Sequence, residues 1–142
     1  MLEPCLVFAD KERVGTWVAK QVGQLSSWGD FYAMGAELNG ELVSGVVFNN
    51  FTDSNATCHI AISKPTRLLP ALLDHAFLYA FYQQRLRRLT AFIEARNVKS
   101  LKINRRLGFV DEGVMELAGT GGQDVHVRVL WPENYRRGKH HG

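Results

Sequence analysis

The sequence predicts one α/β domain, with a mixed, mostly antiparallel, twisted sheet of about six to seven strands flanked by helices. Its length of 142 residues suits a single domain. The composition, 46% hydrophobic and 22% charged, lies near the globular mean and argues against a disordered or fibrous chain. The expected elements alternate strands with helices and include a strand–helix–strand crossover, which favours one sheet covered by helices.

The first half of the chain predicts a strand, a helix and a hairpin. Residues 6–9 form a short apolar run that is typical of a strand. Residues 11–22 carry apolar side chains at helical spacing and follow Asp10, which suits a helix N-cap. Two strand-like runs, residues 31–38 and 42–51, are joined around Asn39-Gly40. Because this pair tolerates positive φ angles, it predicts a two-residue hairpin turn.

The second half predicts four more strands, two helices and a glycine-rich loop. A helix over residues 68–84 carries an apolar stripe that would pack on the sheet, and a short basic helix over residues 98–107 would end at Gly108. Residues 118–124 form the glycine-rich loop; because no helix follows it, the loop is expected to be a turn and not a phosphate cradle. The strands are expected over residues 56–63, 89–95, 109–117 and 125–131.

Composition and charge exclude several classes of protein. The two cysteines, Cys5 and Cys58, make no disulfide framework and lack zinc-ligand spacing, so buried thiols in a reducing compartment and no bound metal are expected. There is neither an apolar run near the ~18 residues of a membrane span nor a signal-peptide pattern, so we expect a cytoplasmic protein with no membrane partner. The net charge of +3 gathers over residues 85–106 and in a basic tail. We expect the domain over residues 1–135 and a disordered tail over residues 136–142.

The most informative segment is residues 88–113. In it a strand runs into Asn97, Ser100 follows on the next helix, and that helix ends in Leu107-Gly108-Phe109 before Glu112-Gly113. This pattern resembles the GNAT acyltransferase superfamily, whose second half shows a strand, N-x-x-S/A, a short helix ending in L-G-F, and E-G. It looks most similar to the branch that acetylates protein N-termini and to small GNAT-like proteins of tailed phages. If it is phage-encoded, the protein is expected to work in the host cytoplasm.

The resemblance implies a site for acetyl-CoA as co-substrate. The fourth and fifth strands of that fold splay apart, and the pantetheine arm lies between them like an extra strand. The N-terminus of the helix after the fourth strand would face the pyrophosphate. Arg67 and Leu69 stand where the family has small residues, so this loop departs from the family. The implied cofactor-binding residues are Ile60, Ala61, Ile62, Lys64, Thr66, Arg67, Leu68, Leu69, Asn97, Ser100 and Lys102.

Asn97 and the basic residues have a second interpretation. An Asn at this position caps a helix without any further function, and both roles can hold together. The basic side chains of this helix have two equally good explanations: they contact a nucleotide, or they form an ordinary solvent-exposed face.

Aminolysis of a thioester needs a polarised carbonyl, a deprotonated amine and a stabilised thiolate. Backbone N–H groups near residues 60–62 are expected to polarise the carbonyl. Many GNAT enzymes have a Tyr seven residues after the Asn, but here that position is Asn104, so Ser100 or a water that it holds is the expected proton donor. The candidates for the base are His59 and Glu94, although a strand His is often structural and Glu94 could face solvent. Asp124 and His126 are expected to hold the amine.

The sequence therefore predicts transfer of an acetyl group from acetyl-CoA to a primary amine: a protein N-terminus or lysine, or a small amine. A homodimer is compatible with it. One alternative is a catalytically inactive GNAT-fold assembly protein, for example in a phage, which the divergent loop and Asn104 support. Another is a nucleic-acid-binding module, suggested by arginines over residues 85–88 beside aromatic side chains. That alternative is weaker because most of these aromatics belong to a stripe that must be buried.

Overall fold

Seven strands form one sheet in the order β1-β2-β3-β4-β5-β7-β6 in the computed structural model, which describes residues 3–136. Neighbouring strands pair antiparallel, except β4 and β5, which run parallel. This confirms the predicted mixed, mostly antiparallel sheet. The strands are β1 (Pro4–Val7), β2 (Phe31–Leu38), β3 (Glu41–Asn49), β4 (Asn55–Ile62), β5 (Arg88–Glu94), β6 (Val110–Met115) and β7 (Val125–Leu130).

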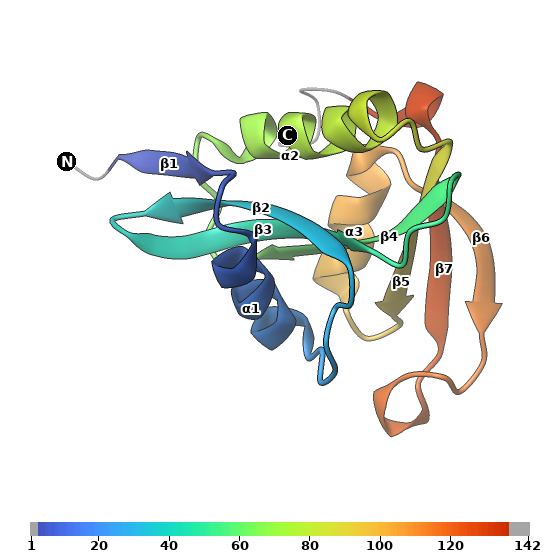
Figure 1. Ribbon diagram of the computed structural model, residues 1–142. Coiled ribbons are helices and arrows are strands. Elements are labelled where there is room, and N and C mark those ends of the chain that lie inside the picture. Colours follow the sequence, from blue (N-terminus) through green and yellow to red (C-terminus); the bar gives the residue numbers. More distant parts are fainter. Residues whose placement is uncertain (1–2, 137–142) are drawn as a thin grey trace.

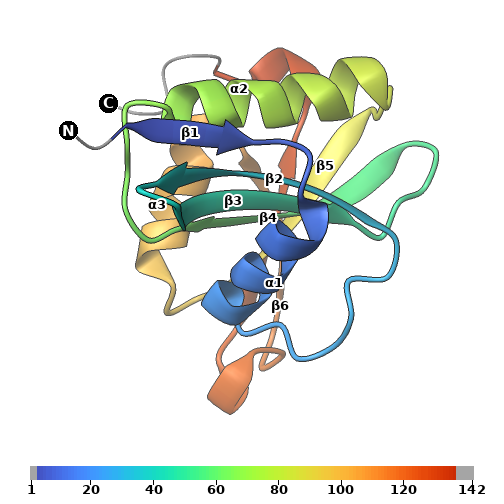
Figure 2. The ribbon, with the colours of Figure 1, turned by 60° about the vertical axis from the view of Figure 1, so that its left-hand side comes forward.

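The helices cover the two faces of this sheet. Figure 1 and Figure 2 show α1 (Lys11–Val22) on the face opposite to α2 (Leu69–Leu78). The third helix, α3 (Val98–Leu107), shares the α2 face, because its Leu107 belongs to the same buried cluster as Leu72 of α2. The α1 face has a separate, smaller cluster built on Val14 and Val18. Among the described residues, no helix is long and apolar enough to cross a membrane.

The larger core lies between the sheet and the pair α2 and α3. Phe77 of α2 is fully buried there, and its ring meets those of Phe48 and Phe109 edge-on at 6.2 and 6.3 Å. Burial of a Phe or Leu side chain contributes roughly 1.5–3 kcal/mol relative to exposure. The apolar stripe predicted for this helix is therefore what attaches α2 to the sheet.

Turn and cap residues set the boundaries of the elements as the sequence predicts. Asn39 and Gly40 adopt φ values of 55° and 81°, which the two-residue hairpin between β2 and β3 needs. Asp10 caps α1 by accepting from Arg13 N, and Gly108 ends α3 with φ of 111°. The helix predicted over residues 68–84 divides into α2 and a π-helical turn, Tyr79–Gln83. The predicted tail lies outside the described residues apart from Arg136.

Candidate functional site

The parallel strands β4 and β5 pair over three residues and then separate. Asn55, Ala56 and Thr57 pair with Arg88, Leu89 and Thr90, whereas no pairing joins residues 58–62 to residues 91–94. On their other sides both strands stay paired, β4 with β3 and β5 with β7. The backbone edges that face each other beyond this point therefore have no strand partner, and a cavity of about 460 Å³ lies between them.

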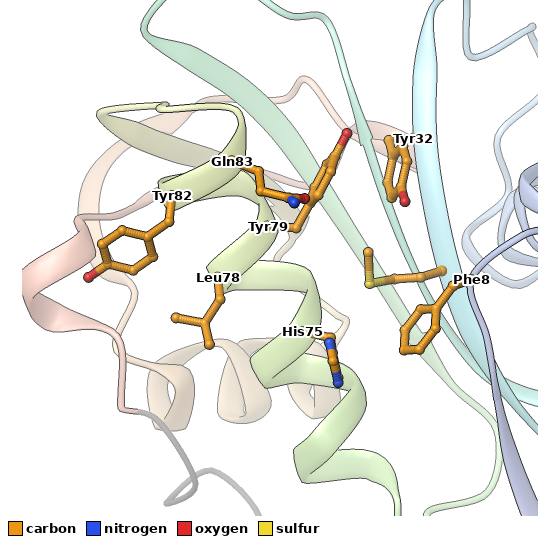
Figure 3. A pocket seen from close by; sticks show the side chains of 8 residues that line it. Phe8, Tyr32, His75, Leu78, Tyr79, Tyr82 and Gln83 are labelled. Atoms are coloured by element: carbon orange, nitrogen blue, oxygen red, sulfur yellow. The ribbon is translucent and has the colours of Figure 1, made fainter.

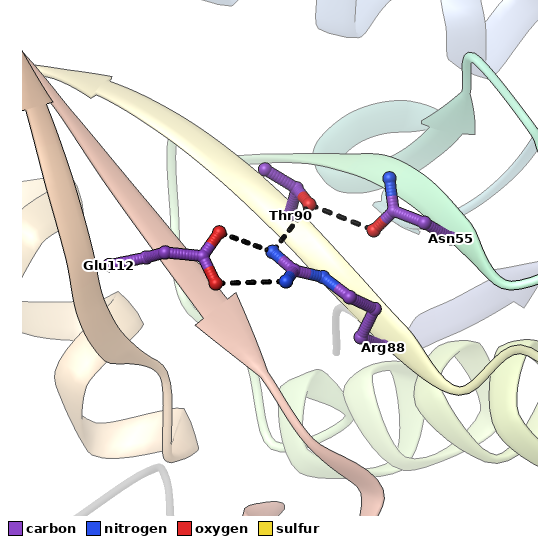
Figure 4. Close-up of polar contacts among 4 residues, drawn as sticks. All are labelled: Asn55, Arg88, Thr90 and Glu112. Carbon is purple, nitrogen blue, oxygen red and sulfur yellow. Dashed lines mark hydrogen bonds and ion pairs between the residues drawn. The ribbon is translucent and has the colours of Figure 1, made fainter.

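A polar network closes the narrow end of this gap. Thr90 Oγ1 on β5 donates to Asn55 Oδ1 on β4 at 2.8 Å, and Arg88 Nη2 donates to Thr90 Oγ1 at 3.2 Å. Figure 4 shows the same guanidinium bonded to Glu112 of β6 through its two Nη atoms; Nη2 donates to Oε1 at 2.6 Å and Nη1 to Oε2 at 2.8 Å. These bonds tie three strands together where the pairing ends, so they hold the origin of the gap in place.

Side chains reach the gap from both faces of the sheet. Along β4, Cys58 and Ile60 belong with the core on the α2 face, so by alternation His59 and Ala61 point to the α1 face. Along β5, Ala91 and Ile93 lie in the α2-face core, which places Phe92 and Glu94 on the α1 face. All of these residues line the cavity. The gap therefore connects the two faces of the sheet.

Helix α3 supplies a polar row on the α2 face. Asn97 caps the helix by accepting from Ser100 N at 3.2 Å, and Ser100 and Asn104 follow at helical spacing on the same side. All three line the cavity. Asn104 is 5% exposed, and its Oδ1 is the one buried side-chain oxygen or nitrogen within residues 3–136 that lacks a hydrogen-bond partner. A buried acceptor without a donor is costly, which makes this oxygen suited to an N–H or O–H of a ligand.

Lys99 spans the open end of the gap. Its Nζ donates to the backbone carbonyl of Ile62, the last residue of β4, at 2.9 Å. Lys99 lies in the first turn of α3, where the helix dipole is unfavourable for a cation. A positive group at this position is suited to an anionic ligand that enters the gap.

His59 is held in one orientation by its neighbours on the α1 face. Asn49 Nδ2 donates to the Trp28 carbonyl at 3.2 Å, which turns Asn49 Oδ1 toward Nε2 of His59 at 2.8 Å. Because Oδ1 can only accept, Nε2 carries the hydrogen and Nδ1 is the free acceptor of the ring. The Trp28 ring packs on the imidazole with centroids 4.6 Å apart. Burial lowers the pKa of His59 from 6.5 to about 4, so the ring is neutral at pH 7.

Glu94, the other candidate base, is already bonded within the protein. Its Oε1 accepts from Thr120 N and Thr120 Oγ1 at 3.1 and 2.8 Å, and its Oε2 accepts from Gln123 Nε2 at 2.9 Å. The carboxylate lines the cavity but anchors the loop between β6 and β7. His59 is therefore better suited than Glu94 to accept a proton.

The loop predicted to face a pyrophosphate lies outside the cavity lining. Lys64 is exposed, Thr66 Oγ1 accepts from Leu68 N at 3.3 Å, and Arg67 forms an exposed ion pair with Glu3 at 2.7 Å. Leu69 is half-buried at the start of α2 and does not obstruct the gap.

Three further candidates also lie away from the gap. Lys102 is exposed on α3 and does not line the cavity. Asp124 Oδ1 accepts from Leu117 N at 3.0 Å and so stabilises the loop between β6 and β7. His126 pairs across the strands with Ile93, so it points to the α3 face and away from His59. Neither Asp124 nor His126 lines the cavity, so the structure does not bring these two residues together with His59.

No sequence motif points to Asn49, Trp28 or Phe92 as part of the site. Their contribution depends on strand register: Val47 of β3 lies opposite His59, and this register brings Asn49 beside the imidazole. The sequence does carry one signal: Asn49 is the polar last residue of a mostly apolar strand, and a buried Asn at a strand end needs hydrogen-bond partners.

A second hollow lies on the α2 face, between the edge of the sheet and the π-helical turn. Figure 3 shows the side chains that line it. The rings of Tyr32 and Tyr79 stack with their centroids 4.1 Å apart, and the centroids of the Phe8 and His75 rings are 4.9 Å apart. The hollow measures about 390 Å³, and none of the residues predicted to bind a cofactor lines it. The gap between β4 and β5 is therefore the candidate site.

Solved acetyltransferase structures share this architecture. A GNAT-family acetyltransferase from Streptococcus pneumoniae matches with a TM-score of 0.70 and 20% identity, over 91% of this chain and 99% of that one. A mutant of the spermidine N-acetyltransferase SpeG from Vibrio cholerae matches with a TM-score of 0.72 and 16% identity, over 93% and 95% of the two chains. The chain has the GNAT fold. No protein-family model and no curated protein sequence matches it.

Within the GNAT fold, the separated strands are the pair that the motif over residues 88–113 implied. The expectation that strands four and five diverge is confirmed by the end of their pairing at Thr57 and Thr90.

Proposed function

We propose that the protein transfers an acetyl group from acetyl-CoA to a primary amine. The observation that carries this proposal is the gap between β4 and β5, with its unpaired backbone edges and its polar row on α3. A pantetheine arm has two secondary amides, and it would complete the interrupted ladder as a short extra strand does. The acceptor is an amine: a protein N-terminus, a lysine or a small amine.

The residues of the gap suit the donor chemically. The orphaned Asn104 Oδ1 needs a donor, and an amide N–H of the pantetheine arm can supply it. Asn97 and Ser100 add polar groups nearer the open end, where Lys99 would exchange the Ile62 carbonyl for a phosphate. When bound, acetyl-CoA supplies the activated acetyl group, and the protein supplies position and hydrogen bonds.

His59 is the proposed base for the amine. Its neutral ring presents Nδ1 as an acceptor, and Asn49 prevents the ring from turning. An amine nitrogen that bonds to the acetyl carbon becomes acidic, so even a weakly basic imidazole can take its proton. Asn104 has no acidic proton, so we assign protonation of the leaving thiolate to Ser100 through a water, or to solvent.

The test is calorimetric titration with acetyl-CoA and CoA, followed by a thiol-release assay with amines. The proposal expects binding and a raised melting temperature, because a ligand that binds only the native state stabilises it. Absence of binding at millimolar acetyl-CoA would favour the alternative of an inactive scaffold.

A pair of variants at Asn97 separates cofactor contact from helix capping. Asn97→Ser keeps a cap that accepts from Ser100 N but removes the amide, whereas Asn97→Ala removes both. We expect both variants to weaken CoA binding, and only Asn97→Ala to lose about 1 kcal/mol of stability. If CoA binds Asn97→Ser as it binds the wild type, Asn97 is only a cap.

A further inference from the structure

The gap has two unlike sides. On the α3 side the cavity is lined by the amides and hydroxyl of Asn97, Ser100 and Asn104. On the α1 side it is lined by the end of α1, by His59 and by Phe92. Two reacting molecules can therefore approach the gap from opposite faces of the sheet. The donor amides match the α3 side, which leaves the α1 side for the acceptor.

The acceptor side has an apolar edge. Val22 at the end of α1 is 43% exposed and Phe92 on β5 is 50% exposed, and both line the cavity. Phe92 points out of the main core because its neighbours Ala91 and Ile93 point into it. Its cross-strand neighbour on β7 is Val127, which continues the apolar surface. Exposed apolar side chains at the mouth of a cavity are typical of a ligand-binding surface.

Glu94 is the one carboxylate among the described residues that line the cavity. The charged side chains of the cavity lining are Glu94 and Lys99. Glu94 accepts hydrogen bonds from Thr120 and Gln123, which are neutral groups, so its single negative charge can offset one ammonium group. Lys99 is a cation, and burial keeps His59 neutral by lowering its pKa to about 4. Each ammonium group of a polyamine beyond the one that Glu94 offsets would therefore find no carboxylate in the cavity lining, and an unpaired charge in such a site is costly.

We infer that the acceptor is a small primary amine with one charge and an apolar body, such as an arylalkylamine, and not a polyamine. This inference rests on the proposed acetyl transfer. The amine would approach Nδ1 of His59 while its body lies against Phe92 and Val22. The ammonium first releases one proton to solvent, and the neutral nitrogen then bonds to the acetyl carbon while the carbon–sulfur bond breaks. A second proton passes from that nitrogen to His59 Nδ1 and on to solvent. The thiolate takes its proton from the water at Ser100 or from solvent, which leaves an amide and the free thiol of CoA.

The test is CoA release at saturating acetyl-CoA with three acceptors: 2-phenylethylamine, spermidine and a short peptide with a free N-terminus. We expect kcat/KM for 2-phenylethylamine to exceed the other two at least about tenfold, since an unpaired charge or a lost apolar contact costs at least this much. Faster turnover of spermidine or of the peptide overturns the inference. So does a protein that binds acetyl-CoA but acetylates none of the three. Failure to bind acetyl-CoA instead overturns the proposed function itself.

Variants at Phe92 identify the surface. Phe92→Ala should lower kcat/KM for 2-phenylethylamine about tenfold, mainly through KM, while Phe92→Leu keeps most of the activity because it keeps an apolar body. Val114→Ala is the matched control, because Val114 is 52% exposed on the other face of the sheet, opposite His126. Since Phe92 is exposed, its variants should fold, which an unchanged Tm confirms. Equal losses in Phe92→Ala and Val114→Ala, or no loss in Phe92→Ala, contradict the inference.

Discussion

Replacing His59 with glutamine should remove a pH-dependent part of the stability. Burial lowers the pKa of His59 from 6.5 to about 4 in the native state. As the pH falls below 6.5, the unfolded chain binds a proton at this position and the native state does not, so the free energy of unfolding decreases until the pH reaches about 4. The pKa of the native state is therefore about 2.5 lower than that of the unfolded chain. At 1.36 kcal/mol for each pH unit, the free energy of unfolding falls by about 3 kcal/mol by pH 4.

His59→Gln is the matched variant because its Nε2 can still donate to Asn49 Oδ1, yet it does not titrate. Urea unfolding of both proteins at pH 7.5, 6, 5 and 4 gives the comparison. The wild type should lose about 3 kcal/mol more than the variant over this range, and most of the loss should come below pH 6. A stability difference that is independent of pH would refute the reasoning, because His59 would then not be held neutral by burial.

Three further predictions test other parts of the structure. Gly108→Ala should lower the free energy of unfolding by at least about 2 kcal/mol, because a φ of 111° is strained for alanine and the added Cβ would lie 2.0 Å from Asn134 O. Gly113→Ala is the control: among the described residues, none but its chain neighbours lies within 4 Å of the added Cβ, so thermal melting should show almost no change in stability. Glu112→Gln should lower the free energy of unfolding in urea by about 1 kcal/mol, because Arg88 loses its charged partner. The same substitution in an Arg88→Met background should have no effect on stability, and an equal loss there would mean that the two side chains are uncoupled. Asn49→Asp should raise the pKa of His59 by placing a carboxylate at its Nε2, which an NMR titration would detect; an unchanged pKa would remove Asn49 as the partner.

The elements that local chemistry sets were predictable from the sequence. Helix α3 runs over the predicted Val98–Leu107 because Asn97 caps one end and Gly108 closes the other. The hairpin turn at Asn39-Gly40 needs positive φ, and both residues adopt it. The division of the helix after β4 was not predicted. The apolar stripe continues from α2 into the π-helical turn Tyr79–Gln83, so periodicity does not reveal the change.

In the candidate site, too, the residues of a local motif were predictable and the contacts between distant segments were not. Asn97 and Ser100 were identified by their motif, and both line the gap. The partner of His59 was not identified, because Asn49 lies on another strand and reaches the imidazole only through the register of β3 on β4. The bonds of Glu94 depend on Thr120 and Gln123 in a loop whose conformation no local pattern specifies. Contacts between distant segments therefore account for most of what the sequence left open.

Amide hydrogen exchange with and without CoA tests most directly whether the unpaired edges of β4 and β5 bind the cofactor. The account predicts that CoA slows exchange along residues 58–62 and 91–94, where the two strands have separated, and leaves the β2–β3 hairpin unchanged. Exchange that is unaffected along both edges at saturating CoA, or protection confined to the hollow between Tyr32 and Tyr79, would contradict it.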